Sequence, residues 1–222
     1  MILKAARSGH NVYMYTLTRG EAAGDPLQRQ QELVQSSEYI GAKALWIDNF
    51  PDTHLAANSD LINHIEVFIN KARADLVITH SPNDTHHDHR AVAASTMEAG
   101  RFVPNMMAYE IPLTKQFYPQ MFYDISDVVD EKVSLIELFR SQRDKVYLHA
   151  NAIKGLAAYR ALQSRLNFSS LLPEPVHVEA FETMKVCIDS TFKLSNSKYM
   201  QLEHVIPVKS SPRGIVEFPS RM

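Results

Sequence analysis

The fold is decided by the stretch Leu76-Val77-Ile78-Thr79-His80-Ser81-Pro82-Asn83-Asp84-Thr85-His86-His87-Asp88-His89. Its apolar start is typical of a buried strand, and the small residues that follow it, from Ala91 to Ala94, favour a helix. Open α/β sheets place their chemistry where a strand ends and a helix begins. The stretch holds four of the ten histidines and two aspartates, and imidazole with carboxylate binds zinc and transfers protons. The sequence therefore predicts a strand, a polar turn with a chemical role, and a helix.

Two interpretations of this histidine cluster are open from the residues alone. In the first it is a site, because His86 and His89 share one face of a helical turn and Asp88 can accept a ring N–H. In the second it is a polar loop in which an aspartate caps the helix. His80, last on the strand, is then either a ligand or a brace for the loop. So many imidazoles and carboxylates in one turn favour the site.

Composition excludes several classes of protein. The 222 residues carry a net charge of −2, which implies no broad basic surface for nucleic acid. The single cysteine, Cys187, forms no internal disulfide and fits a reducing compartment. No run of about 18 apolar residues predicts a membrane span, and the first residues do not form a signal peptide, so we expect a cytoplasmic protein. No serine-hydrolase or P-loop pattern occurs.

Strand and helix patterns alternate through the first half of the chain. The alternation predicts a parallel sheet with right-handed crossovers. Residues 1–9 indicate the end of a helix, with Gly9 as its stop. Strands are expected over 11–17, 44–47 and 76–79, and helices over 27–40, 60–73 and from 90 to about 99.

The second half has a different pattern. Residues 106–111 and 121–125 are expected as strands, 128–165 as mostly helical with a break near Ser141 or Leu148, 167–177 as a loop, and 179–188 as a last strand or strand-helix junction. The Ser/Lys/Pro-rich segment after it is expected to pack loosely. We therefore expect one domain over 1–188 and a C-terminal tail over 189–222.

Several motifs match one known family. The chain resembles the PIG-L / LmbE-like zinc deacetylases, which remove acetyl groups from N-acetylglucosamine-containing compounds. The resemblance covers residues 1 to about 188 and implies a Rossmann-like, three-layer α/β fold with a mainly parallel sheet. The motifs that carry it are 79–92, which is similar to the family's His-x-Asp-His motif, together with 16–22, 29–33, 52–55, 109–112, 124–126 and 179–181.

The resemblance implies a role for five residues. His89 matches the zinc ligand, His86 the histidine that stabilises the oxyanion when protonated, and Asp88 the carboxylate that orients or charges it. Arg29 and Asp52 match substrate-contacting positions. From the residues alone, Arg29 is equally well a helix-surface arginine paired with Glu32, and Asp52 a turn carboxylate.

The chain departs from the family at its first motif. Ala-His-Pro-Asp-Asp-Glu, which in the family supplies two further zinc ligands and the general base, does not occur. We therefore expect the zinc site to be incomplete in this chain. The strand that carries the motif is also expected to be missing, which would leave a gap between the strands at 11–17 and 76–79. We interpret Met1 as an internal methionine of a longer protein, and the reading frame upstream of Met1 tests this.

The resemblance predicts a zinc-dependent hydrolase that removes an acetyl group from a small N-acetylated sugar conjugate. One alternative is a catalytically inactive homologue that acts as a sugar-binding or interaction domain. A weaker alternative is a hydrolase of a non-sugar amide. No nucleic acid or membrane partner is expected, and a homo-oligomer is compatible with the sequence.

Overall fold

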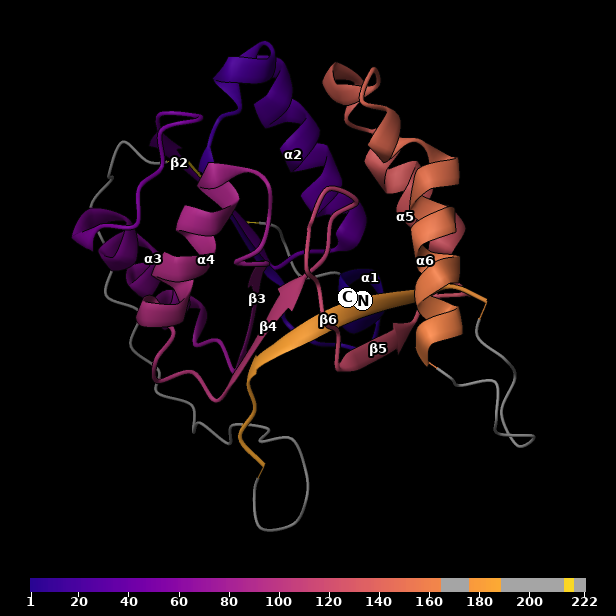
Figure 1. The fold of residues 1–222 in the computed structure, drawn as a ribbon. Coiled ribbons are helices and arrows are strands. Elements are labelled where there is room, and N and C mark those ends of the chain that lie inside the picture. Colours follow the sequence, from indigo (N-terminus) through magenta and orange to yellow (C-terminus); the bar gives the residue numbers. More distant parts are fainter. Residues whose placement is uncertain (165–175, 189–213, 218–222) are drawn as a thin grey trace.

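A computed structural model describes residues 1–164, 176–188 and 214–217. Its strands form two sheets, one with the order β1-β2-β7 and one with the order β3-β4-β6-β5. Helices pack around them (Figure 1). The strands are β1 (Tyr13–Thr18), β2 (Ala44–Phe50), β3 (Leu76–His80), β4 (Asn105–Tyr109), β5 (Met121–Asp124), β6 (Val178–Lys185) and β7 (Gly214–Glu217). The helices are α1 (Ile2–Arg7), α2 (Pro26–Ile40), α3 (Ser59–Ala72), α4 (His87–Ala99), α5 (Val129–Glu137) and α6 (Ala150–Ser164), with short 3₁₀ turns η1 (Glu21–Ala23), η2 (Arg140–Gln142) and η3 (Val146–Leu148).

The α/β class predicted from the sequence is confirmed. Strands β1 and β2 run parallel, as do β3 and β4, with a helix in each crossover. Local signals explain the helix limits. Asp25 caps α2 by accepting the N–H of Leu27, and Gly41 ends that helix with a φ of 78°. Gly9, with a φ of 84°, follows α1 as expected.

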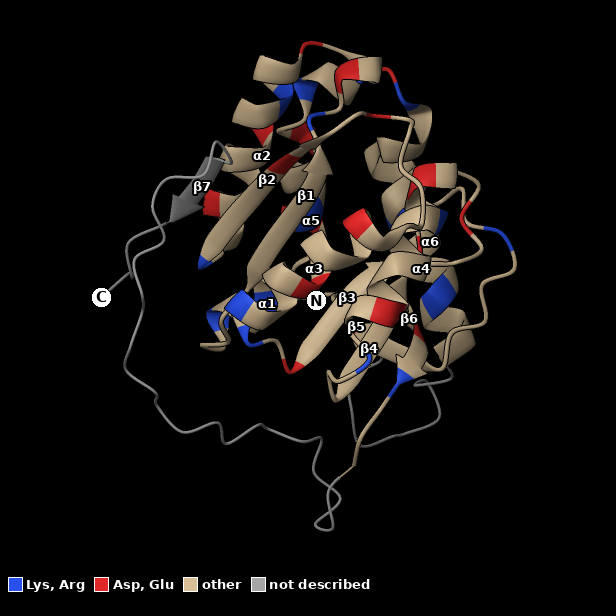
Figure 2. Cartoon of the chain, turned by 90° about the vertical axis from the view of Figure 1, so that its left-hand side faces the viewer, with Lys and Arg blue, Asp and Glu red and all other residues tan. Residues whose placement is uncertain are grey.

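Strands β1 and β3 do not pair with each other. Within the described residues, each has one strand partner and stands at the edge of its sheet. Figure 2 shows β1 beside β2, and β3 in the set that contains β4, β5 and β6. The expected separation of these two strands is therefore confirmed, whereas the missing strand itself stays a prediction.

The second half of the chain adds antiparallel pairs. β6 pairs antiparallel with both β4 and β5. The helical region breaks at η2 and η3, near Ser141 and Leu148 as predicted. β7 was not anticipated; it adds an antiparallel edge to β2. Most of the predicted loop over 167–177 and most of the predicted tail lie outside the described residues, so their packing stays a prediction.

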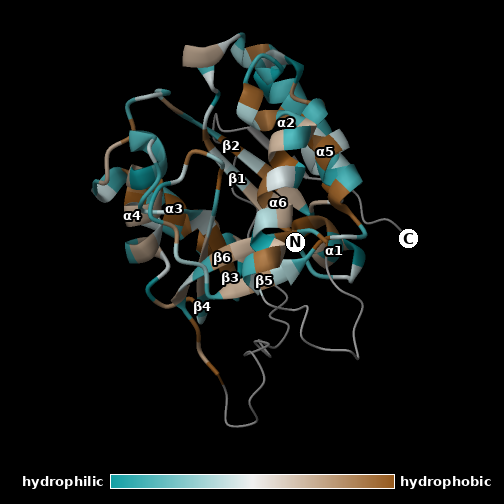
Figure 3. Ribbon diagram, turned by 45° about the vertical axis from the view of Figure 1, so that its right-hand side comes forward, coloured by the Kyte–Doolittle hydropathy of each residue, from teal (hydrophilic) through white to brown (hydrophobic). Residues whose placement is uncertain are grey.

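The main core lies between the helices and the ends of both sheets. It joins Leu17 of β1 to Leu61, Ile65 and Ile69 of α3 and to Met106 of β4. Apolar side chains at i, i+4 and i+8 along α3 form the face that packs inward. Figure 3 shows hydrophilic residues on the outer turns of α2, and Figure 2 shows acidic and basic residues interspersed over the visible surface. No helix in the described part of the chain has the length and apolar character to cross a membrane.

Candidate metal centre and active site

The turn between β3 and α4 folds around Asp84. Its carboxylate Oδ1 accepts the N–H of His86 at 2.8 Å, and its backbone N–H donates to Ser81 at 3.2 Å. Arg90 clamps the same turn by donating from Nη1 to the carbonyl oxygens of Asp84 and Thr85, both at 2.8 Å. These local bonds explain why a polar segment adopts one conformation between a strand and a helix.

The first turn of α4 is capped by a histidine. His86 is the N-cap residue, and its ring Nδ1 accepts the backbone N–H of Asp88 at 3.2 Å. The expected alternative, an aspartate cap, is therefore wrong. Because a backbone N–H can only donate, Nδ1 carries no proton and the neutral ring has its proton on Nε2. His86 is exposed, so this N–H donor faces away from the capping bond toward solvent.

His80, Asp84 and His89 form a group at the end of β3 in which Asp84 is buried and the two histidines are half-buried. Their candidate ligand atoms lie within 4.8 Å of one another. The rings of His80 and His89 stack at 3.9 Å between centroids with an angle of 8°. The hydroxyl of Tyr109, at the end of β4, contacts His80 Nδ1 at 2.7 Å.

Burial favours the uncharged forms of His80 and Tyr109. Burial, assisted by the neighbouring His89 and His86, lowers the pKa of His80 to about 3. Burial also raises the pKa of Tyr109. Both groups are therefore uncharged at neutral pH, which suits a structural contact between an imidazole and a phenol.

Asp84 and His89 fit a metal ion by one specific observation. Asp84 Oδ2 lies 3.0 Å from His89 Nδ1, yet this buried ring nitrogen makes no hydrogen bond within the described residues. The two atoms are close but are not aligned as in a hydrogen bond. Two ligand atoms that both point at one metal ion would have this arrangement. Imidazole nitrogen and carboxylate oxygen are both zinc donors.

His80 fits less well as a ligand. Lone pairs of imidazole nitrogens lie in the ring plane, and those of two parallel stacked rings run alongside each other instead of converging. Its Nδ1 also contacts Tyr109. In this arrangement His80 therefore braces the ring of His89, and this group offers two good ligands where catalytic zinc commonly uses three protein ligands.

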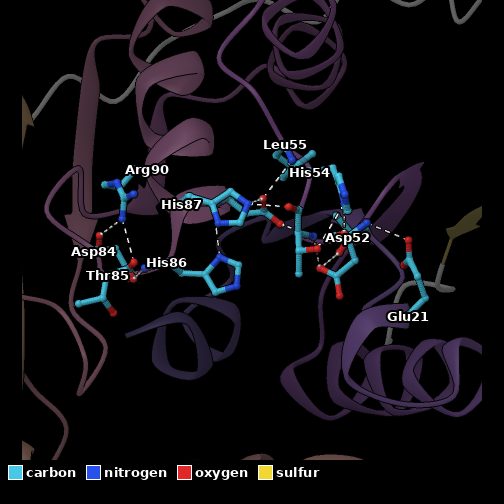
Figure 4. A network of polar contacts seen from close by, with 12 residues as sticks. Glu21, Asp52, His54, Leu55, Asp84, Thr85, His86, His87 and Arg90 are labelled. Carbon is cyan, nitrogen blue, oxygen red and sulfur yellow. Dashed lines mark hydrogen bonds and ion pairs between the residues drawn. The ribbon is translucent and has the colours of Figure 1, made fainter.

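Asp88 anchors α4 to the loop that follows β2. Its buried carboxylate accepts the N–H of Thr53 at 2.8 Å and that of Leu55 at 3.0 Å. His87, the first residue of α4, contacts the same loop, with its Nε2 2.6 Å from the carbonyl oxygen of Thr53 (Figure 4). Thr53 has a φ of 64°, an unusual value for a β-branched residue that these bonds hold in place.

Asp88 was expected to orient or charge His86. The bonds of its carboxylate in the described chain go instead to the loop at Thr53 and Leu55 and to His87, 3.0 Å away. Only its backbone N–H contacts the His86 ring. The geometry therefore supports an indirect role: the Asp88 carboxylate fixes the helix start, and the helix start fixes His86.

Asp52 and Arg29 lie at the other end of this network. Asp52 accepts the N–H of Ala22 at 3.1 Å and the hydroxyl of Thr18 at 3.3 Å, so it acts as a turn carboxylate here. The guanidinium of Arg29 lies against Gly20, where a Cβ would be only 2.8 Å from Nε. Figure 4 follows the contacts from Glu21 and Asp52 to His87 and His86.

Arg29 does not form the expected ion pair with Glu32. That buried carboxylate accepts the N–H and hydroxyl of Ser141 and the side-chain amide of Gln28. Nε and Nη1 of Arg29 are buried without a hydrogen-bond partner among the described residues. A buried guanidinium with unused donors suits contact with a bound ligand.

Sequence reasoning missed the role of Asp84 and the binding of Asp88 by the loop after β2. The sequence does contain a signal for Asp84, because it is an acidic residue in a turn between a buried strand and a helix. The sequence contains no signal for the contacts of Asp88, since they join segments more than 30 residues apart.

Known proteins resemble this chain in sequence and in fold. The profile of the PIG-L family, described as GlcNAc-PI de-N-acetylase, matches residues 1–100. Over 135 residues the chain is 30% identical to the uncharacterized deacetylase YaiS of Escherichia coli (strain K12), covering 57% of this chain and 72% of that protein. It is 31% identical over 144 residues to the diacetylchitobiose deacetylase of Thermococcus kodakarensis, covering 56% of this chain and 54%, about half, of that enzyme.

A solved structure shares the fold. The 4-carboxy-2-hydroxymuconate hydratase GalB of Pseudomonas putida KT2440 superposes with a TM-score of 0.73 at 19% identity, over 85% of this chain and 90% of that chain. Its name describes a different reaction, so the fold does not by itself define the chemistry. The family match does more, because residues 1–100 include Arg29, Asp52 and the whole histidine cluster. Together with the match to most of YaiS, it shows that this chain belongs to the PIG-L family of deacetylases.

Proposed function

We propose that this site belongs to a zinc-dependent deacetylase that hydrolyses the acetamide of an N-acetylated sugar. One observation carries the proposal: the segment from Asp84 to His89 places the half-buried His89 beside the buried Asp84 and leaves His86 exposed, with the His86 ring stacked on that of His89 at 4.7 Å between centroids. This arrangement suits a hydrolase that uses a metal ion, because an accessible group that contacts the substrate lies next to the metal ligands.

His89 and Asp84 would hold the ion. When bound, zinc supplies a Lewis acid for the acetyl carbonyl and an activated water. His86 would contact the carbonyl oxygen of the substrate. Its Nε2–H donates to the oxygen as negative charge develops there, and the capping bond to Asp88 keeps that N–H oriented. The carbon–nitrogen bond would then break as the base returns the water's proton to the leaving nitrogen, and acetate and a sugar amine would be released.

Arg29 and Asp52 are proposed to contact the sugar. Arg29 has buried donors that are unused in the described structure, and Asp52 is one residue before Thr53, whose N–H binds Asp88. A hexose presents hydroxyl groups, which both accept from a guanidinium and donate to a carboxylate. The diacetylchitobiose deacetylase named above acts on such an N-acetylated sugar.

The water's proton requires a base. The resemblance assigns it to an aspartate of the His-Pro-Asp-Asp motif, which does not occur in these 222 residues. We therefore propose the reaction for this site in combination with that motif. The alternative, an inactive sugar-binding or interaction domain, applies to a protein that lacks it.

Zinc content and acetate release test the proposal together. Both are measured with N-acetylglucosamine and N,N'-diacetylchitobiose, for the 222-residue chain and for the product of the reading frame extended upstream of Met1. We expect zinc-dependent acetate release from the form that contains the motif. Zinc binding without acetate release from either sugar by any form would contradict the proposed reaction.

A further inference from the structure

Two loops bind the turn between β3 and α4. The loop after β2 binds it through the contacts of Asp88 described above. The segment 115–118, in the loop between β4 and β5, binds it through Asn83. The N–H of Lys115 donates to the carbonyl of Asn83 at 3.2 Å, and the side chain of Asn83 donates to the carbonyl of Gln116 at 3.0 Å. Because Asn83 directly precedes a candidate metal ligand, this segment lies in direct contact with the candidate site.

Glu182 of β6 attaches the same segment at a second point. Its carboxylate accepts the N–H of Tyr118 at 2.7 Å through Oε1 and the hydroxyl of the buried Ser81 at 3.2 Å through Oε2. The hydroxyl of Ser81 in turn accepts the N–H of Asn83 at 3.2 Å. One carboxylate thus links the segment 115–118 to the start of the turn, so side chains as well as backbone fix their relative position.

Gln116 has a left-handed backbone conformation, with a φ of 50°. In the described part of the chain, Arg73 and Thr53 are the two other residues besides glycine with a positive φ. Arg73 is the C-cap of α3, where this conformation is common, and Thr53 binds Asp88 of the candidate site. Glycine adopts this conformation without steric cost. Other residues that adopt it in a loop are concentrated at functional sites, which makes Gln116 a candidate functional residue.

The side chain of Gln116 is available to a ligand. Gln116 is exposed, and its amide makes no hydrogen bond with any residue that the structure describes. An amide offers two donor hydrogens and one acceptor oxygen, which match the hydroxyl groups of a sugar. His86, which is also exposed, follows three residues after Asn83, whose side chain holds the backbone of Gln116. The open amide and the proposed oxyanion donor therefore lie on segments that contact each other.

We propose that Gln116 is a specificity-determining residue whose side-chain amide hydrogen-bonds a hydroxyl group of the N-acetylated sugar. The bonds from Asn83 and Glu182 hold its segment in position for this contact. The proposal rests on the proposed deacetylase function. It also accounts for a strained glutamine at a position where glycine would fit without strain, because glycine has no amide side chain to bind the substrate.

Two substitutions separate a contact with the substrate from a structural role. Gln116→Ala removes the amide and keeps the strained backbone, whereas Gln116→Gly removes the amide and relieves the strain. The glycine variant should therefore have the higher melting temperature of the two. In the form that contains the first motif, both variants should raise the KM for N-acetylglucosamine about three- to tenfold at unchanged kcat, the loss expected for one hydrogen bond to the substrate.

Gln120→Ala is the matched control. Gln120 is an exposed glutamine at the end of the same loop, and its amide oxygen accepts the N–H of Thr183 on β6 at 2.8 Å. The substitution removes an amide from this loop and leaves the contacts of Asn83 in place, so the KM should not change. A KM that follows the melting temperature across the three variants would show a structural role and overturn the inference.

Direct binding separates this inference from the proposed reaction. Calorimetric titration of N-acetylglucosamine into wild type and the two Gln116 variants needs no turnover. Weaker binding to both variants than to wild type supports the contact even if no acetate is released from any sugar. Acetate release with the wild-type KM in both variants would overturn the inference and leave the deacetylase function standing. Absence of binding to the wild type would overturn the inference as well.

Discussion

Two adjoining clusters of ionisable groups, between the end of β3 and the first turn of α4, have different environments. His80, Asp84 and His89 are buried or half-buried, whereas His86 and His87 are exposed and only Asp88 of their cluster is buried. The first cluster is closed by stacked rings and by Tyr109. The second is open to solvent and held from below by the backbone of the loop after β2. Residues of the same type thus have different environments at neighbouring positions of the chain.

Position at the start of α4 accompanies the difference. Asp84 and His86 precede the helix, and on its first turn His87 is exposed, Asp88 is buried and His89 is half-buried. The ring of His86 stacks on that of His89 with 4.7 Å between centroids, so the two clusters adjoin. The buried cluster is suited to hold an ion, and the exposed cluster to contact a substrate. Four variants test this division, from the largest expected effect to the smallest.

His89→Ala should have the largest effect. Removing the inner imidazole leaves Asp84 as the one good ligand in this turn, so zinc content should fall from about one ion per chain to near zero. Activity of the motif-containing form should be lost with it. Metal analysis after dialysis measures the change. Retention of a full equivalent of zinc would contradict the assignment of the buried cluster.

His86→Ala should leave the metal in place and reduce turnover. Loss of one oxyanion donor lowers kcat by about 10²–10³. His87→Ala is the matched control, because His87 is an equally exposed neighbour that contacts the carbonyl of Thr53. Equal losses of kcat in the two variants would show that the effect is structural and not specific to the oxyanion.

Loss of a residue that only supports a metal ligand costs about 10- to 100-fold in metal affinity, so Asp84→Asn, which changes a proposed ligand itself, should weaken zinc binding by at least that much without unfolding the protein. The amide keeps the shape of the side chain and can still accept the N–H of His86, but it has no negative charge. Competition with a chelator of known affinity measures the change. An unchanged zinc affinity would exclude Asp84 from the metal centre.

Tyr109→Phe should have the smallest effect. The buried hydroxyl contributes one hydrogen bond to His80, and its removal should lower the free energy of unfolding by about 1 kcal/mol. Zinc stoichiometry should stay at the wild-type value. Urea denaturation checks the stability, and a loss of zinc in this variant would show that the contact between Tyr109 and His80 supports the metal centre.

The sequence predicted those features of the fold that depend on local signals. The alternation of β1, α2, β2, α3, β3 and α4 follows from apolar periodicity, and the breaks near Ser141 and Leu148 were also expected. β7 was missed, because its pairing with β2 joins residues about 170 positions apart and no local pattern encodes it.

The candidate site was only partly predictable for the same reason. The sequence shows which residues belong to the histidine cluster, and helical spacing predicts that His86 and His89 lie close together. The binding of the Asp88 carboxylate to the loop at Thr53 and Leu55 depends on how α4 packs against the end of β2. The identity of the helix cap also depended on the structure, since the aspartates of the turn were the more common choice.

The central claim is that the cluster of His80, Asp84 and His89 binds the zinc ion, whereas the exposed cluster contacts the substrate. Anomalous diffraction at the zinc edge, from crystals of the zinc-loaded protein, locates the ion directly. The account predicts one strong anomalous peak beside His89 and Asp84. A peak among His86, His87 and Asp88, with none at the buried cluster, would contradict it.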